Sequence, residues 1–392
     1  MQCLLFIRPA PLSRPKRLLS VLRTALYAAC IAPLPAGASE FAPLGDLAGG
    51  GFASFAAGVS DDGTVVVGRS IGARGYEAFR WTQADGMAGI GDLPGGLLES
   101  LAYDVSGDGP VVVGRGRNAG SQFEAFRWTQ AGGMVGLGNL PGGQTESAAN
   151  ATNSDGSVVV GYGKTAAFTN EAFRWTQAGG MVGLGTLAGV GSSFARGVSD
   201  DGSIVVGAGH NASFDYEAFR WTQAGGMVGL GDLAGWGFFS QAYGVSGDGR
   251  VVVGYSESTN GMEAFRWTQG GGMVGIGDLP GGGFESVAYG VNSDGSVVVG
   301  RGLNANSFEA FRWTQTGGMQ TVTDWLTAAG VTVAPGYLLA NAMDVSADGS
   351  TVVGESYGPS GDEAYIARVS AVGSGSVSMP DLPAVRATCH SA

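Results

Sequence analysis

Cysteine and histidine are almost absent from this chain of 392 residues. Its three cysteines are Cys3, Cys30 and Cys389, so residues 39–369 contain none. That stretch can therefore form neither a disulfide framework nor a thiolate metal site. Its single histidine, His210, has no repeated partner with which to build a triad or a metal site. We expect no catalytic residue, no metal and no cofactor.

Positive charge is scarce once the N-terminal segment is set aside. Residues 1–38 hold five basic residues and no acidic one, which leaves 16 basic against 33 acidic residues and a net charge of −17. Lys164 is the only lysine beyond that segment. This balance disfavours partners such as nucleic acid or an anionic membrane surface. It suits a soluble, exported protein.

Long apolar runs are missing except near the N-terminus. There, a run from Thr24 to Ala36 follows several basic residues and ends in Ala36-Gly37-Ala38. This order is typical of a signal peptide cleaved after Ala38. Arg23 makes the run too short for a membrane span, so we expect none after cleavage. Tyr27-Ala28-Ala29-Cys30 offers a weaker alternative, a lipoprotein box.

The chain is rich in glycine, with 72 residues. It also repeats one seven-residue motif, Glu-Ala-Phe-Arg-Trp-Thr-Gln, which we call the heptad. The complete copies occupy 77–83, 124–130, 171–177, 217–223, 263–269 and 309–315, and a degenerate seventh copy begins at Glu363. Successive copies start 47, 47, 46, 46, 46 and 54 residues apart. A fixed period in the forties indicates a repeat architecture whose units share one core.

Each repeat contains four strand-like pieces. Examples are Ala242–Ser246, then Val251–Gly254 after an Asp-Gly hairpin turn, then the heptad, then a piece like Met227–Leu233. Alternation along the heptad separates Phe and Trp from Ala and Arg, so we expect Phe and Trp to be core residues between stacked sheets. Four strands in about 46 residues is the size of one propeller blade.

The two ends of the repeat region are out of phase. The region starts with a lone fourth strand, Phe41–Leu47, and ends with a third strand, Glu363–Val369. Pairing them would complete the last blade and remove two open edges. We therefore interpret the chain as all-β, with a seven-bladed β-propeller over residues 39–369 that is closed by pairing the N-terminal strand with the C-terminal blade. An open β-solenoid is the alternative and would need capping repeats.

Two segments depart from the repeat. Residues 319–342 are expected to hold a short helix, capped by Thr323 or Asp324 and ending at Gly330, that covers the junction near the paired ends. Residues 370–392 form a Gly/Ser-rich tail without pattern.

The repeat resembles that of the extracellular HAF-repeat family. The resemblance rests on Ala218-Phe-Arg-Trp221, Met227-Val-Gly-Leu-Gly-Asp-Leu233 and Asp248-Gly-Arg-Val-Val-Val-Gly254, and it covers nearly all of 41–369. Glu stands where the family has the His of its name. The resemblance implies a β-repeat fold and a secreted or bacterial cell-surface location, and it implies no established activity.

The most variable parts of the repeat predict the ligand site. Antiparallel order places the Asp-Gly and Gln-x-Gly-Gly-Met turns on one rim, where the sequence hardly varies, and the other two connections on the opposite rim, where it does. Scaffolds place recognition on variable loops, and Arg and aromatic side chains suit sugar or protein ligands. The predicted ligand-binding residues are Arg115, Arg117, Tyr162, Lys164, His210, Tyr216, Trp236, Phe238, Tyr255 and Arg301.

Two acidic patterns allow more than one interpretation. The repeated Glu of the heptad could form a carboxylate ring around the channel that binds a cation. It could instead make one structural hydrogen bond per blade, or pair with the heptad Arg, although blade seven keeps Glu363 where Ile366 replaces that Arg. The Asp-Gly loops lack the carboxylate density of a calcium loop and are expected to be plain turns.

Three function hypotheses follow. The first is an exported, monomeric, non-catalytic module that binds a glycan or a protein. The second is a surface-display passenger without a fixed ligand. The third is a propeller glycan lyase or hydrolase, which would need an acid/base pair at the channel mouth, for which Asp215 and His210 are the only candidates.

Overall fold

The computed structural model describes residues 38–187, 189, 191–235 and 237–370. Apart from Ala38 and Ser370, the predicted signal peptide and the predicted tail lie outside this part of the chain. The described residues form 28 strands and one short helix, so the predicted all-β class is confirmed. The helix found there is too short to cross a membrane.

The strands follow the predicted order of four per repeat. The first strands are β2 (Ser54–Val59), β6 (Ser100–Val105), β10 (Ser147–Thr152), β14 (Ser193–Val198), β18 (Ser240–Val245), β22 (Gly281–Val291) and β26 (Leu338–Val345). The second strands are β3 (Val65–Gly72), β7 (Val111–Arg117), β11 (Val158–Lys164), β15 (Ile204–His210), β19 (Val251–Ser258), β23 (Val297–Asn304) and β27 (Thr351–Gly358).

The heptad supplies the third strands. These are β4 (Gly75–Thr82), β8 (Phe123–Thr129), β12 (Asn170–Thr176), β16 (Tyr216–Thr222), β20 (Gly261–Thr268), β24 (Phe308–Thr314) and β28 (Gly361–Arg368). The fourth strands are β5 (Gly86–Gly89), β9 (Gly133–Gly136), β13 (Gly180–Gly183), β17 (Gly226–Gly229), β21 (Gly272–Gly275), β25 (Gly318–Thr321) and, from the start of the region, β1 (Glu40–Pro43).

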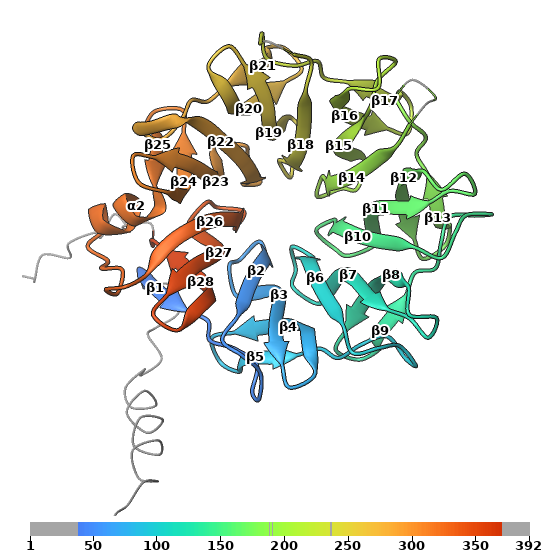
Figure 1. Ribbon diagram of the computed structural model, residues 1–392, viewed down its shortest axis with the longest axis horizontal. Coiled ribbons are helices and arrows are strands. Elements are labelled where there is room, and N and C mark those ends of the chain that lie inside the picture. The colour runs from blue at the N-terminus through green and yellow to red at the C-terminus, as the bar shows by residue number, and fades with distance from the viewer. Residues whose placement is uncertain (1–37, 188, 190, 236, 371–392) are drawn as a thin grey trace, which may run out of the picture. The chain divides into compact units, whose positions relative to one another are not determined.

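Antiparallel pairing joins the strands into sheets of four. Among the described residues, five sheets have four strands each, and β18 to β25 form an eight-stranded sheet that is held together by a single parallel pair, Met262 with Glu285. The N-terminal strand β1 pairs with β28, with Glu40 opposite Arg368. Figure 1 shows the sheets arranged around a common centre, with the first strand of each sheet innermost.

The core lies between neighbouring sheets. The heptad Phe of one sheet packs with the heptad Ala of the sheet before it, as Phe219 does with Ala172, and both side chains are fully buried. The same large-on-small pairing recurs between Phe79 and Ala364, which come from the first and last repeats. The predicted core role of Phe is confirmed, whereas the tryptophans mostly lie half-buried at the edge of each cluster.

A β-bulge in each first strand explains the glycine that ends Val-Val-Val-Gly. In β14 the register shifts between Ala195 and Gly197, which moves the Phe194 carbonyl toward the second strand. A Cβ added at Gly207 would lie 1.9 Å from that carbonyl oxygen. Glycine is therefore required here by a close approach of two backbones.

A buried serine links each first strand to the preceding sheet. Ser100 Oγ accepts a hydrogen bond from Ala78 N at 3.0 Å and donates one to Gly91 O at 2.8 Å. Ser54 makes the same two bonds to Ala364 N and Gly45 O. The last repeat is joined to the first by the same contact as its internal neighbours.

The helix departs from its prediction at its N-terminus. Helix α2 spans Val322–Ala328 and is capped by Thr321, whose Oγ1 accepts from Asp324 N, so both predicted caps were wrong by two or three residues. Val322 and Leu326 are buried in the cluster that contains Tyr365 of β28. The helix therefore covers the sheet in which β1 pairs with β28, as predicted.

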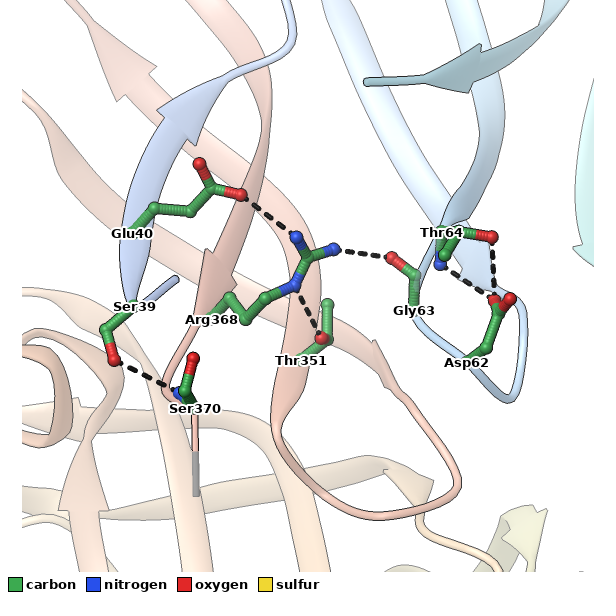
Figure 2. Close-up of polar contacts among 8 residues, drawn as sticks. All are labelled: Ser39, Glu40, Asp62, Gly63, Thr64, Thr351, Arg368 and Ser370. Carbon is green, nitrogen blue, oxygen red and sulfur yellow. Dashed lines mark hydrogen bonds and ion pairs between the residues drawn. The ribbon is translucent and has the colours of Figure 1, made fainter. Parts of the chain in front are cut away.

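Arg368 of that sheet contacts β1, β27 and the Asp-Gly turn of the first repeat, as Figure 2 shows. Its guanidinium pairs with Glu40 of β1 at 3.1 Å, and donates to Thr351 Oγ1 at 3.1 Å and to Gly63 O at 2.7 Å. In other sheets the heptad Arg reaches the corresponding glycine carbonyl of the next repeat, as Arg127 does with Gly156. Arg368 supplies this contact where Ile366 has replaced the heptad Arg.

Candidate functional site

The bulges of the first strands direct one side chain of every repeat into a common cavity. The register skips one residue at each bulge, and all seven skipped residues line a cavity of about 180 Å³. These residues are Ala57, Tyr103, Asn150, Arg196, Tyr243, Tyr289 and Met343. They differ from repeat to repeat, although the alanine before them is constant in the sequence.

A second variable position lies beside the first. It directly follows the glycine of Val-Val-Val-Gly in the second strand and holds Arg69, Arg115, Tyr162, Ala208, Tyr255, Arg301 and Glu355. Together the larger side chains of the two positions form what we call the axial belt. The axial belt comprises Arg69, Tyr103, Arg115, Tyr162, Arg196, Tyr243, Tyr255, Tyr289, Arg301 and Glu355.

Ring and charge contacts connect the axial belt across sheets. Arg196 lies over the Tyr243 ring at 4.2 Å. The Tyr243 ring is 5.5 Å from Tyr289 and stacks on Tyr255 at 5.8 Å. Arg69 and Glu355, from the first and last repeats, approach to 4.0 Å, and burial raises the pKa of the Glu355 carboxyl. The belt therefore continues across the junction between the chain ends.

Two arginines of the axial belt have unused hydrogen-bonding capacity. The Arg115 guanidinium lies 4.2 Å over the Phe123 ring, and that of Arg301 lies 4.7 Å over Phe308. In both, Nε is buried and has no hydrogen-bond partner among the described residues. Buried donors are normally satisfied, so these two Nε groups are exceptions to the usual pairing.

Two carboxyl groups form the floor of the cavity. Asp344 accepts hydrogen bonds from Val345 N and, across the junction of the chain ends, from Val59 N at 2.9 Å. Asp104 accepts from Val105 N and from Thr152 N of the next sheet. Burial raises the pKa of Asp344 to about 7 and the pKa of Asp104 well above its usual range.

Below this floor lies a smaller cavity of about 100 Å³ at the end with the Asp-Gly turns. There, Ser154 Oγ donates to Asp61 at 3.0 Å and Ser293 Oγ donates to Asp200 at 2.9 Å. Burial raises the pKa of Asp61. Within the described ranges, no group of three or more His, Cys, Asp or Glu residues is arranged to hold a metal ion.

Of the three interpretations of the heptad Glu, the structure favours a structural hydrogen bond in each repeat over a carboxylate ring around the channel. The Glu lies on the third strand, away from the innermost strands, and Glu217 Oε1 accepts from Gly231 N at 3.1 Å. Four other copies make the same bond, while Glu309 accepts from Asn304 and Glu363 from Tyr337. The bond holds the chain where it turns at Gly231, so β17 ends at Gly229 and is shorter than the predicted Met227–Leu233.

The Asp-Gly loops are plain turns, as predicted. The Asp62 carboxylate accepts hydrogen bonds from Thr64 N and Oγ1 and from Ser60 Oγ, and Gly63 has a φ of 71° (Figure 2). Oδ1 of Asp62 is thus used three times within the turn.

Four of the predicted ligand-binding residues belong to the axial belt: Arg115, Tyr162, Tyr255 and Arg301. Arg117 instead pairs with Glu99, and Lys164 with Glu146, at the ends of their strands.

Of the remaining predicted residues, His210 and Tyr216 lie at the ends of β15 and β16, Phe238 lies in a loop, and Trp236 lies outside the described part. The His210 Nδ1 accepts from Ser192 N at 2.9 Å, and its ring packs on Tyr216 at 4.4 Å. Phe238 is exposed, and Trp236 lies outside the described residues. Because His210 Nδ1 accepts this hydrogen bond from Ser192 N, Nδ1 is not available to pair with Asp215.

Sequence reasoning missed six members of the axial belt because it searched loops and not strands. They are Arg69, Tyr103, Arg196, Tyr243, Tyr289 and Glu355. The signal was present in the repeat alignment, where a position between a constant Ala and a nearly constant Val alternates among Ala, Tyr, Asn, Arg and Met. Variation beside the constant Ala is the pattern expected of a side chain that core packing does not fix.

The raised pKa values of the cavity floor predict how stability depends on pH. Between about pH 4 and pH 7 the Asp344 carboxyl keeps its proton in the folded protein. In the unfolded chain an aspartate with a pKa of about 3.9 has lost that proton. The free energy of unfolding should therefore fall as pH rises from about 4 to about 7. Over this pH range, we expect the decrease in the free energy of unfolding to be smaller in Asp344→Asn than in the unchanged protein, by on the order of 1–3 kcal/mol.

The measurement is thermal unfolding between pH 5 and pH 8. Asp348→Asn is the control, because turn hydrogen bonds lower the pKa of Asp348 and it does not titrate in this window. Equal pH slopes for Asp344→Asn and the unchanged protein would contradict the assignment.

Comparison with known proteins gives the fold and nothing finer. No protein-family model and no curated protein matches the chain. Oligogalacturonate lyase from Vibrio parahaemolyticus is 13% identical, with a TM-score of 0.54 over 84% of this chain and 93% of that one. An oligogalacturonate lyase in complex with manganese is 14% identical, with a TM-score of 0.50 over 80% and 88%. TolB from Acinetobacter baumannii is 10% identical, with a TM-score of 0.44 over 78% and 80%. The lyase likeness identifies the fold as that of a β-propeller.

Proposed function

We propose that this chain is a seven-bladed, closed β-propeller that is exported and acts as a non-catalytic binding module, with its ligand entering the axial belt from the variable rim. Export and membership of the HAF-repeat family belong to this proposal, as does a monomeric state. The ligand is a glycan or a protein.

Closure is supported by hydrogen bonds that run from turn to turn around the centre. The Asp-Gly turns of all seven repeats are joined in series by backbone bonds of 3.0 to 3.4 Å, and the series returns to Asp61. The donor–acceptor pairs are Asp61–Gly107, Asp108–Ser154, Ser154–Asp200, Asp200–Gly247, Asp248–Ser293, Ser293–Ala347 and Ala347–Asp61. The Ser54 bonds and the Arg368 contacts support the same arrangement.

One observation carries the binding function. The bulged position of the first strand varies from repeat to repeat, and all seven of its residues line a single cavity. A repeat that served only to fold would keep this position uniform, as it keeps Phe, Ala and Gly. Polar and aromatic groups converging on a cavity are the usual composition of a ligand site.

A glycan array probed with the purified protein, with and without EDTA, tests the proposal. Tyr243→Ala and Arg196→Ala alter the axial belt, and Tyr357→Ala alters an exposed aromatic residue elsewhere on the last second strand. We expect binding by the unchanged protein and by Tyr357→Ala, and weaker binding by the two belt variants. Belt variants that bind as well as the unchanged protein would contradict the proposed site.

If the folded protein binds neither glycans nor proteins, the result favours the alternative function, a surface-display passenger without a fixed ligand. A lyase or hydrolase is less favoured. It would need an acid and a base facing one another at the channel mouth. The axial belt contains one carboxyl group, that of Glu355, and the two carboxyl groups at the cavity floor, those of Asp104 and Asp344, each accept two backbone hydrogen bonds.

A further inference from the structure

We infer that a second site, on the rim opposite the variable loops, binds the phosphate group of a soluble phosphate monoester, such as a phosphorylated sugar. The residues that hold the phosphate are Arg220, Arg250 and Arg266. This site is separate from the axial belt, so the inference goes beyond the proposed function and does not depend on it.

The three arginines line one pocket of about 570 Å³. Arg220 lies on β16 and Arg266 on β20, the third strands of two successive repeats, and Arg250 directly follows the Asp-Gly turn of the second of these repeats. That turn and the glycine-rich turn that begins at Gln269 both line the pocket, which places it on the rim whose sequence hardly varies. Its volume is within the roughly 300–1,000 Å³ of sites that hold small organic ligands.

Arg220 and Arg266 do not make the contact that the heptad Arg makes in other repeats. Arg127, Arg174 and Arg312 each donate to the glycine carbonyl of the next Asp-Gly turn. Among the described residues, neither Arg220 nor Arg266 has a hydrogen bond or an ion pair, and neither has a side-chain nitrogen that is buried without a partner. Their guanidinium groups are therefore open to solvent and to a ligand in the pocket.

Arg250 adds a third cation at a position where no other repeat has one. In the other six repeats the residue after the Asp-Gly turn is Thr64, Pro110, Ser157, Ser203, Ser296 or Ser350. Gly249 is the repeat counterpart of Gly156, which Arg127 reaches, so the turn that carries Arg250 lies next to Arg220. The Arg250 side chain is 84% exposed, and its ion pair with Asp248 is 3.7 Å long. A guanidinium held so loosely is available to a stronger anion.

The pocket has more positive than negative charge, although the chain after residue 38 has a net charge of −17. Its lining holds three guanidinium groups and two carboxylates, those of Asp248 and Asp294. Each carboxylate already accepts hydrogen bonds from groups of its own turn. The axial cavity has the opposite balance, with one arginine against two aspartates. The pocket therefore attracts anions that the rest of the chain repels.

The number of guanidinium groups favours phosphate over carboxylate. A phosphate monoester presents three acceptor oxygens and a charge of about −1.5 to −2 at pH 7, whereas a carboxylate presents two oxygens and a single charge. A guanidinium donates two parallel hydrogen bonds to such a group. The half-buried Trp267 lines the same pocket, so apolar ring surface is present for the organic part of the ester. The acidity of the chain favours a soluble ester over a lipid headgroup in an anionic membrane.

Calorimetric titration with glucose 6-phosphate, glucuronate and glucose tests the inference. We expect the phosphate ester to bind at least tenfold more tightly than either of the other two, and its binding to weaken as salt is added. Arg220→Gln and Arg266→Gln should each weaken phosphate binding about tenfold or more, because each removes a charged hydrogen-bond donor.

Arg80→Gln is the matched control. Arg80 is the heptad Arg of the first repeat, it also has no hydrogen bond or ion pair among the described residues, and it does not line this pocket. This variant, and Tyr243→Ala in the axial belt, should bind glucose 6-phosphate as the unchanged protein does. Melting temperatures, measured alongside, exclude unfolding as the cause of lost binding.

Equal affinity for glucose 6-phosphate and glucuronate, or unchanged phosphate binding in both Arg220→Gln and Arg266→Gln, would overturn the inference. So would binding to phosphatidic acid vesicles without binding of the soluble ester. If a glycan binds at the axial belt and glucose 6-phosphate does not bind, the inference fails and the proposed function stands. If only the phosphate ester binds, and only through these arginines, the inference stands and the proposed function fails.

Discussion

Replacing Arg368 with methionine should lower the free energy of unfolding by about 3 kcal/mol. The side chains of Arg368 and Glu40 are each only 11% exposed, so the substitution leaves a largely buried carboxylate without its partner. It also removes the hydrogen bonds to Gly63 O and Thr351 Oγ1. Because Arg368 connects β1, β27 and the first Asp-Gly turn, protease should cut β1 faster in this variant.

Denaturant unfolding of three variants gives the measurement. Arg250→Met is the control, because its ion pair with Asp248 is 3.7 Å long and its side chain is 84% exposed. Such a surface pair contributes at most about 1 kcal/mol. In the double variant Arg368→Met/Glu40→Gln we expect part of the stability to return. If Arg368→Met behaves like Arg250→Met, the contact does not hold the chain ends together.

Gly207→Ala should destabilise the protein by about 3 kcal/mol or more, or prevent folding. The added Cβ would lie 1.9 Å from Phe194 O and 3.0 Å from Ala195 Cα, both backbone atoms that no rotamer change can move. Overpacking usually costs about 1–3 kcal/mol when side chains can adjust, and here they cannot.

Gly209→Ala is a matched control two residues along the same buried strand. Its Cβ would meet Ser192 and Ser193 atoms at 3.4 Å, which is ordinary contact. We expect a change within about 0.5 kcal/mol for this variant. The measurement compares the soluble expression and the thermal unfolding of the Gly207→Ala and Gly209→Ala proteins. Equal stabilities would show that the bulge does not dictate glycine at this position.

The four-strand repeat could be predicted because its cause is local and recurs. The Asp-Gly turn, the Val-Val-Val run and the heptad each specify a strand or its end from their own residues. The length of the fourth strand could not be predicted in this way. It depends on a heptad Glu that folds back onto Gly231 N, a contact between residues 14 positions apart.

The site was predicted only in part for the same reason. Arg115 and Arg301 were named because they stand at the start of variable loops. Tyr103 and Tyr243 were not, because their exposure follows from a bulge that one strand's sequence does not reveal. The short helix was predicted within a few residues, since Thr321 and Thr323 are both plausible caps and only tertiary packing chooses between them.

A disulfide between residues 39 and 370 tests the closed propeller most directly. The axial belt depends on that closure, because Arg69 and Glu355 come from the first and last repeats. Ser370 N donates to Ser39 Oγ at 3.1 Å. In a protein with Cys3, Cys30 and Cys389 replaced by serine, Ser39→Cys/Ser370→Cys should form an intramolecular disulfide in the folded state. Mass spectrometry would detect it, and a Ser39→Cys/Ser203→Cys control should keep both thiols free. Free thiols in the first variant, as in the control, would contradict closure by the chain ends.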